Sequence, residues 1–173
     1  MIIETERLII REFNEQDIDA LFEMNRDPQI LTYIPTEPFQ SREQAEDLFN
    51  TVVLENYARY GYGRWAVYHK QDKKVIGFCG PKFIEELNEI EIGYRYFSEY
   101  WGKGIASEAT NAILPLLPKY GIEEVIALIL EGNVGSESVA KKSGLTLREK
   151  TMFMGHSVSV YHRAIKTMNK KAS

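Results

Sequence analysis

The 173-residue sequence is poor in the side chains that bind metals or form disulfides, with one cysteine and three histidines. A single thiol, Cys79, cannot form an internal disulfide, which is typical of a reducing compartment. The Cys and His residues show no metal-ligand spacing, so we predict no metal site. Cys79 lies in the strand-like run VIGFCG with no histidine nearby in sequence, so we expect a small buried hydrophobe rather than a nucleophile.

Long hydrophobic runs are also missing. No apolar stretch approaches the roughly 18 residues of a membrane span, and the start MIIETERL lacks the basic and apolar regions of a secretion signal. We therefore expect a cytoplasmic protein with no membrane partner. Repeats, low-complexity tracts and linkers are absent as well, so the length predicts one domain over residues 1–173, with 169–173 as a frayed tail.

The sequence has little excess charge of either sign, with a net charge of −4. A nucleic-acid-binding protein would present a broad basic surface, so we expect no nucleic-acid partner. The charge is nevertheless uneven, because residues 1–60 hold 13 Asp and Glu against 5 Lys and Arg. A field divided in this way favours an enzyme with two ligands of opposite charge.

The segment from Ile90 to Asn111 combines a strand, a glycine turn and a helix. Residues 90–96 alternate and are rich in aromatic side chains, as in a β-strand. Apolar residues then recur at helical spacing: Ile105, Ala109, Ala112, Ile113, Leu116 and Leu117. The turn between them reads WGKGIA, residues 101–106. A tight glycine turn that opens a helix exposes backbone N–H groups at the positive end of the helix dipole, so it predicts an anion site, above all for a diphosphate.

This turn resembles the phosphate loop of the GCN5-related N-acetyltransferases (GNAT). Their pattern is Gln or Arg, two residues, Gly, one residue, then Gly or Ala, and Trp101, Gly104 and Ala106 take those three places. The resemblance implies that acetyl-CoA is the acetyl donor and that the loop holds its diphosphate through Trp101, Gly102, Lys103, Gly104, Ile105, Ala106 and Ser107. Two other nucleotide motifs do not fit, because a P-loop needs Ser or Thr after its lysine and a dinucleotide fold needs a third glycine where Ser107 stands.

Within the family, the Trp-Gly-Lys-Gly run followed by Glu108-Ala109 is similar to the RimJ/RimL-like branch of ribosomal-protein N-terminal acetyltransferases. That branch often has Val-Asp-Val near its end. This chain has Val158-Ser159-Val160 there, which weakens transfer of the branch's substrate preference.

Residues 133–145 resemble a second signature of the GNAT family. The resemblance implies that Asn133 hydrogen-bonds the pantetheine arm of the cofactor and that Ser136 lies close to the thioester sulfur. The backbone groups of Tyr94, Arg95 and Tyr96 would pair with pantetheine like an added strand. In many family members a tyrosine protonates the leaving thiolate, but this chain has Ala140 at that position, so Ser136 is the substitute that the resemblance offers.

The acceptor amine must lose a proton before it can attack the thioester, because an amine of pKa about 7.7–10.4 is mostly ammonium at neutral pH. Glu89 and Glu91 lie on the same face of the strand, shortly before the thioester position. We choose Glu91 as the general base. Glu89 and water-mediated proton loss remain alternatives.

The pattern of elements predicts an α/β (α+β) fold of GNAT type. The resemblance covers about residues 4–168 and implies a mixed, mostly antiparallel seven-stranded sheet with a splayed central parallel strand pair, flanked by about four helices. The expected strands cover residues 6–13, 64–69, 74–84, 90–96, 123–130, 145–154 and 158–168. The expected helices cover residues 14–26, 41–59, 133–142 and a segment from 105 that bends or ends between 114 and 120, since Pro115 and Pro118 lack the N–H group that helices need.

The sequence therefore predicts an acetyl-CoA-dependent N-acetyltransferase that works by direct attack of a cationic amine, as a monomer or homodimer. The acceptor is either a protein N-terminus or a small amine such as an antibiotic, polyamine or amino acid. A non-catalytic acyl-CoA-binding module is the alternative, and Ala140 is its best support.

Overall fold

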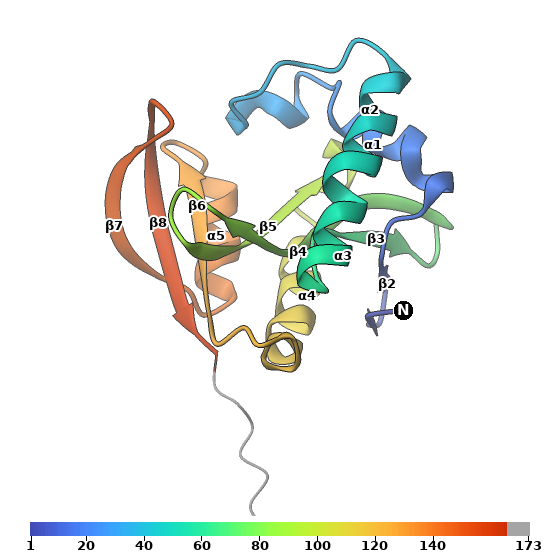
Figure 1. Ribbon diagram of the computed structural model, residues 1–173. Helices are drawn as coiled ribbons and strands as arrows, with labels where there is room; N and C mark the ends of the chain where they lie inside the picture. The colour runs from blue at the N-terminus through green and yellow to red at the C-terminus, as the bar shows by residue number, and fades with distance from the viewer. Residues whose placement is uncertain (166–173) are drawn as a thin grey trace, which may run out of the picture.

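The computed structural model describes residues 1–165, which form one eight-stranded sheet with helices on both faces (Figure 1). The strand order is β1-β2-β3-β4-β5-β6-β8-β7, and only β5 and β6 are parallel neighbours. The strands are Ile3–Glu4 (β1), Leu8–Arg11 (β2), Trp65–His69 (β3), Lys74–Ile84 (β4), Glu89–Tyr96 (β5), Glu124–Leu130 (β6), Thr146–Phe153 (β7) and His156–Ala164 (β8). The helices are Ile18–Met24 (α1), Arg42–Leu48 (α2), Leu54–Tyr60 (α3), Ile105–Ile113 (α4) and Val134–Lys142 (α5).

The predicted fold class is confirmed, with one strand more than expected. Ile3 and Glu4 pair with Ile10 and Ile9 of β2, and this two-residue strand is too short to show an alternating pattern in sequence. Residues 166–168 of the expected last strand and the expected tail 169–173 lie outside the described residues.

The helix expected over residues 41–59 is divided into three parts. Ser41 caps α2 in a capping box with Gln44, as the sequence indicates. A π-helical segment, Phe49–Val53, then separates α2 from α3. Short 3-10 helices cover Glu15–Asp17, Ile30–Tyr33 and Ser98–Tyr100.

The expected break in the helix from Ile105 is present. The α-helical part ends at Ile113, and a 3-10 helix continues over Leu114–Tyr120 to Gly121 at φ +78°. Pro115 and Pro118 lie in the 3-10 part, because proline cannot donate the hydrogen bonds that would extend the α-helix.

The sheet separates two cores, and β3 contributes alternately to both. Trp65 and Val67 pack in the cluster that contains α4, whereas Ala66 packs in the cluster of α1, α2 and the π-helical segment. Period-two alternation of this kind is what a sheet covered on both faces requires. No helix within residues 1–165 is long and apolar enough to cross a membrane.

Candidate active site

The parallel strands β5 and β6 pair at a single position, Glu91 with Ile126, and then diverge. Beyond that point, residues 92–96 of β5 have no partner strand on the β6 side within residues 1–165. Unpaired strand backbone is a ready template for an extended ligand, because its N–H and C=O groups need partners. The split therefore opens a slot between the two halves of the sheet, where the sequence predicts pantetheine to lie along Tyr94, Arg95 and Tyr96.

The glycine turn lies at the far end of this slot and opens α4. Gly102 and Gly104 have φ values of +71° and +76°, which glycine adopts without strain. A Cβ atom built on Gly102 would meet nothing within 4 Å, and one on Gly104 would meet only Nη2 of Arg7 at 3.7 Å. Residues 101–104 are exposed, whereas Ile105 is buried. Free backbone N–H groups, open space and the helix N-terminus together suit a phosphate group.

Long-range contacts fix the position of this turn. Glu108 accepts hydrogen bonds from Thr5 Oγ1 at 2.7 Å and from Arg7 Nε at 2.7 Å, and Arg7 Nη1 donates to the carbonyl of Lys103 at 2.9 Å. On the other side, Trp101 Nε1 donates to the carbonyl of Tyr96 at 3.0 Å. The turn is thus tied to both the edge of the sheet and the end of β5, and the Glu-Ala pair of the signature has a structural role.

Asn133 and Ser136 form a local pair at the start of α5. The Asn133 side chain accepts from the backbone N–H of Ser136 at 3.2 Å and donates through Nδ2 to Ser136 Oγ at 3.0 Å. Asn133 is therefore the helix cap, and the hydroxyl of Ser136 keeps its own proton for another acceptor. Tyr94 Oη donates to the carbonyl of Ser136 at 3.0 Å and so holds α5 against β5.

Glu91 lies where the strands separate, and both of its carboxylate oxygens are hydrogen-bonded. Oε1 accepts from Arg64 Nη2 at 2.6 Å, and Oε2 accepts from the backbone N–H of Leu128 at 3.1 Å. The second bond occupies an N–H group of β6 beyond the last pairing with β5. Glu91 therefore caps the split of the sheet in addition to facing the pocket, a contact that the sequence did not indicate.

The carboxylate of Glu89 pairs with a different arginine. It forms two hydrogen bonds with Arg148 of β7, at 2.6 and 2.9 Å. These bonds lower the pKa of Glu89 below its usual range, which makes it a weaker proton acceptor.

The side chains of Tyr96, Ala140 and Cys79 are structural. Tyr96 is buried, and so is Ala140, which packs in the main core. Cys79 is fully buried, and this burial raises its pKa to about 11. A nucleophilic thiol needs access and a lowered pKa, so Cys79 matches the expected small hydrophobe. Within residues 1–165, no group of three or more His, Cys, Asp or Glu could hold a metal ion.

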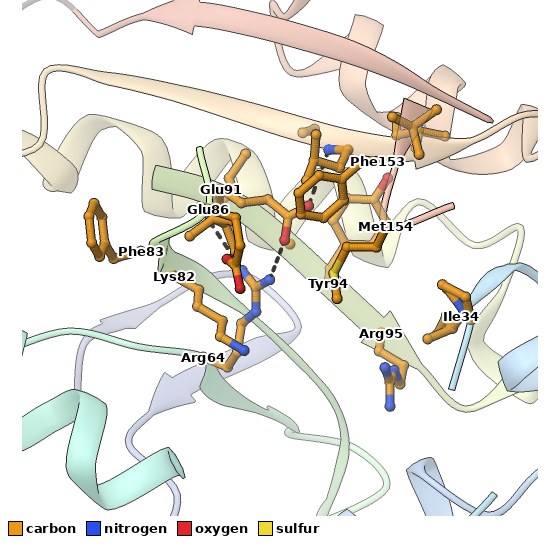
Figure 2. Close-up of a pocket in the computed structure, with 18 of the residues that line it drawn as sticks. Ile34, Arg64, Lys82, Phe83, Glu86, Glu91, Tyr94, Arg95, Phe153 and Met154 are labelled. Carbon is orange, nitrogen blue, oxygen red and sulfur yellow. Dashed lines mark hydrogen bonds and ion pairs between the residues drawn. The ribbon is translucent and has the colours of Figure 1, made fainter. Parts of the chain in front are cut away.

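A cavity of about 600 Å³ joins these elements (Figure 2). Its walls come from β4, β5, β6, α3, the 3-10 turn at Ile30–Tyr33 and the β7–β8 hairpin. Glu91 and Ser136 both line it, as do four basic side chains, Arg59, Arg64, Lys82 and Arg95, of which Arg59 is exposed and pairs with Glu85 at 3.9 Å. Nothing in the sequence pointed to Arg59, Arg64 or Lys82 as lining residues, and the family resemblance implied a role only for the backbone of Arg95.

Comparison with known proteins gives the family. Residues 7–146 match the family model described as acetyltransferase (GNAT) domain. The chain belongs to the GNAT acetyltransferase family. The uncharacterized N-acetyltransferase p20 of Bacillus licheniformis is 32% identical over 171 residues, which cover 91% of each chain. For this GNAT protein, the predicted enzyme class and the acetyl-CoA-dependent chemistry are thus confirmed at the level of the family.

Solved structures show the same fold. RimL, the ribosomal L7/L12 alpha-N-protein acetyltransferase in complex with coenzyme A, has a TM-score of 0.80 and 22% identity, covering 95% of this chain and 97% of RimL. Spermidine N-acetyltransferase from Vibrio cholerae, in complex with CoA and spermine, has a TM-score of 0.77 and 19% identity, covering 93% and 97%. The acceptors of these two proteins differ, so the shared fold leaves both predicted acceptor classes open.

Proposed function

We propose that this GNAT protein transfers the acetyl group of acetyl-CoA to a primary amine by direct attack within a ternary complex. The carrying observation is the continuous path from the exposed glycine turn at α4, along the unpaired backbone of β5, to the cavity that contains Glu91 and Ser136. In this proposal the diphosphate lies on residues 101–107 and pantetheine lies in the slot. The thioester then faces the cavity from the slot, and the amine approaches it from the opposite side of the cavity.

The amine nitrogen forms a bond to the thioester carbonyl carbon, and the carbon–sulfur bond breaks to release CoA thiolate. Ser136 donates its hydroxyl proton in a hydrogen bond to the sulfur as negative charge develops there. Asn133 supports this role because its Nδ2 atom occupies a lone pair of Ser136 Oγ and so directs the hydroxyl proton elsewhere. A serine hydroxyl is a poor acid toward a thiol of pKa about 8.5, so Ser136 stabilises the thiolate rather than protonating it fully.

Glu91 is our candidate for accepting the amine proton. It lines the cavity, and each carboxylate oxygen retains a lone pair beyond the bonds to Arg64 and Leu128. The bond to Arg64 holds the Glu91 carboxylate in place beside the cavity. In this proposal the amine proton reaches Glu91 through an intervening water molecule.

The Trp-Gly-Lys-Gly run and Glu108-Ala109 support membership of the RimJ/RimL-like branch, with a protein N-terminus as acceptor. The second candidate acceptor is a small amine, for which the cavity of about 600 Å³ is the favouring observation, since it is the size of a small-molecule site. A screen of peptides and small amines with acetyl-CoA, following thiol release, distinguishes these acceptors. Failure of every amine with a protein that binds acetyl-CoA would favour the non-catalytic binding module.

The diphosphate site has its own test in Gly104→Val. The new side chain enters the open space above the turn, and we expect calorimetry to show loss of acetyl-CoA binding. Gly121→Val is the matched control, since Gly121 also has a positive φ and open surroundings but lies at the end of the 3-10 helix. Unchanged affinity in a folded Gly104 variant would contradict the assignment.

A further inference from the structure

A row of basic side chains crosses the cavity wall where β4 meets β5. Gly80 of β4 lies opposite Gly93 of β5. The guanidinium group of Arg64 occupies the space that Gly93 leaves, whereas the backbone of residues 63–65 lies against Gly80. Arg64 Nη1 donates to the carbonyl of Gly80 at 2.6 Å, and a Cβ atom on Gly93 would lie 2.5 Å from Arg64 Nη2. Lys82 and Arg95 come from the same two strands, on either side of Arg64 in the view of Figure 2.

Within residues 1–165, this row has more positive charge than its surroundings neutralise. Glu91 pairs with Arg64, but neither Lys82 nor Arg95 forms an ion pair with a carboxylate there. Arg95 donates to the neutral Asn25 Oδ1 at 2.8 Å, and its buried Nε atom has no acceptor. The row therefore holds two cations without an ion pair, and the exposed Glu86 offsets only part of the charge at Lys82.

The surroundings make this excess costly. Burial, and then the neighbouring Arg64, lowers the pKa of Arg95 to about 10. The same two causes lower the pKa of Lys82. Removing an ion from water without a counter-ion destabilises a fold. Arg95 contacts Asn25 and the face of the Phe78 ring, and neither contact supplies a negative charge. Charged groups kept at such a cost in a cavity commonly serve a ligand.

We propose that the acceptor amine also carries a carboxylate or phosphate group, which binds to Lys82 and Arg95. This inference rests on the proposed acetyl transfer and specifies its acceptor. Exposed carboxylates of Glu55, Glu85 and Glu86 line the same cavity toward solvent. A small zwitterionic amine is complementary to both features, since its ammonium group meets acidic side chains on entry and its anionic group meets the basic row.

The test uses pairs of acceptors that differ only in the anionic group. Amino acids are compared with their carboxamides, and O-phosphoethanolamine with ethanolamine, by thiol release from acetyl-CoA. We expect kcat/KM for the anionic member to exceed that of its neutral partner by at least about tenfold in one of the two series. The series that shows the preference identifies carboxylate or phosphate as the bound group.

Variants assign the preference to the basic row. Lys82→Met and Arg95→Met should each reduce the preference several-fold, mainly through KM for the anionic member. Lys119→Met is the control, because Lys119 is exposed in the 3-10 helix after α4 and lies outside the cavity lining. A preference that persists in the Lys82/Arg95 double variant would overturn the proposal.

A second measurement does not depend on turnover. With CoA bound, the anionic acceptors should raise the melting temperature of the wild-type protein more than their neutral partners do, and this difference should disappear in the double variant. Lys82→Met alone should raise the melting temperature of the free protein, because it removes an unneutralised charge. Equal rates and equal stabilisation within all pairs would exclude an anionic acceptor while leaving acetyl transfer intact, whereas failure of acetyl-CoA binding would refute the proposed function itself.

Discussion

Replacing Glu91 by glutamine tests two roles of this residue in one variant. The Glu91 and Arg64 side chains are only 15% and 18% exposed, so their hydrogen bond at 2.6 Å is largely shielded from water. A carboxylate can accept from Arg64 and from the Leu128 N–H at once, but an amide has a single acceptor oxygen. The glutamine side chain of the variant can therefore satisfy one of the two donors and must turn its NH₂ group toward the other.

The expected change in the free energy of unfolding follows from the loss of one such hydrogen bond. A hydrogen bond to a charged group contributes about 1.5–3 kcal/mol, and an unsatisfied buried N–H costs about 1–3 kcal/mol. We expect Glu91→Gln to lower the free energy of unfolding by about 2 kcal/mol, which corresponds to about 4–8 °C in melting temperature for a domain of this size. Glu89→Gln is the control, because its more exposed pair with Arg148 should contribute about 1 kcal/mol or less.

The pH dependence of the rate separates catalysis from support of the sheet. If Glu91 accepts the amine proton, kcat/KM of Glu91→Gln falls most near neutral pH and recovers above the pKa of the acceptor, where free amine is abundant. A lower melting temperature with an equal loss of rate at every pH would show that Glu91 acts only by holding the strands apart. An unchanged melting temperature and pH profile would refute both roles.

Three further outcomes follow from the geometry. Ser136→Ala should lower kcat more than about tenfold with little change in acetyl-CoA affinity, measured by steady-state kinetics and calorimetry, because its hydroxyl matters when charge develops on sulfur. Native Cys79 should resist thiol reagents until the protein unfolds, because it is fully buried, and rapid labelling without loss of structure would contradict this. Gly93→Ala should lower the unfolding free energy by about 1–3 kcal/mol through its clash with the Arg64 guanidinium. The cost should shrink in an Arg64→Ala background, and an equal cost in both backgrounds would place the strain elsewhere.

Sequence patterns predicted the elements that depend on local chemistry. The strand Lys74–Ile84 and the end of α4 ahead of Pro115 both follow from neighbouring residues, and the structure has each of them. Asn133 caps α5, a role that the cofactor-binding interpretation had displaced. The contacts that shape the cavity could not be predicted in this way. Arg64 and Glu91 are 27 positions apart, and their pairing depends on the order of strands in the sheet.

A partial signal for the basic row was nevertheless present. Gly80 and Gly93 lie in two strands that the sequence joins as neighbours, and facing glycines indicate that a large group approaches the sheet. Nothing in the sequence showed that this group is Arg64, because the strand β3 that follows it could have lain elsewhere in the sheet. The structure supplies that register through the pairing of Trp65 with Cys79.

The split of the sheet and the charge of the cavity depend on one chain of contacts. The split leaves the Leu128 N–H without a β5 partner, and Glu91 satisfies it. A carboxylate in that position needs a counter-ion, which Arg64 supplies, and Arg64 can reach the sheet only because Gly93 lacks a side chain. Glu91, Arg64 and Gly93 are therefore all needed to form the split that admits the cofactor. Lys82 makes none of these contacts, so it can change with the acceptor at little cost to the split, and we expect acceptor preference to be determined there rather than at Glu91.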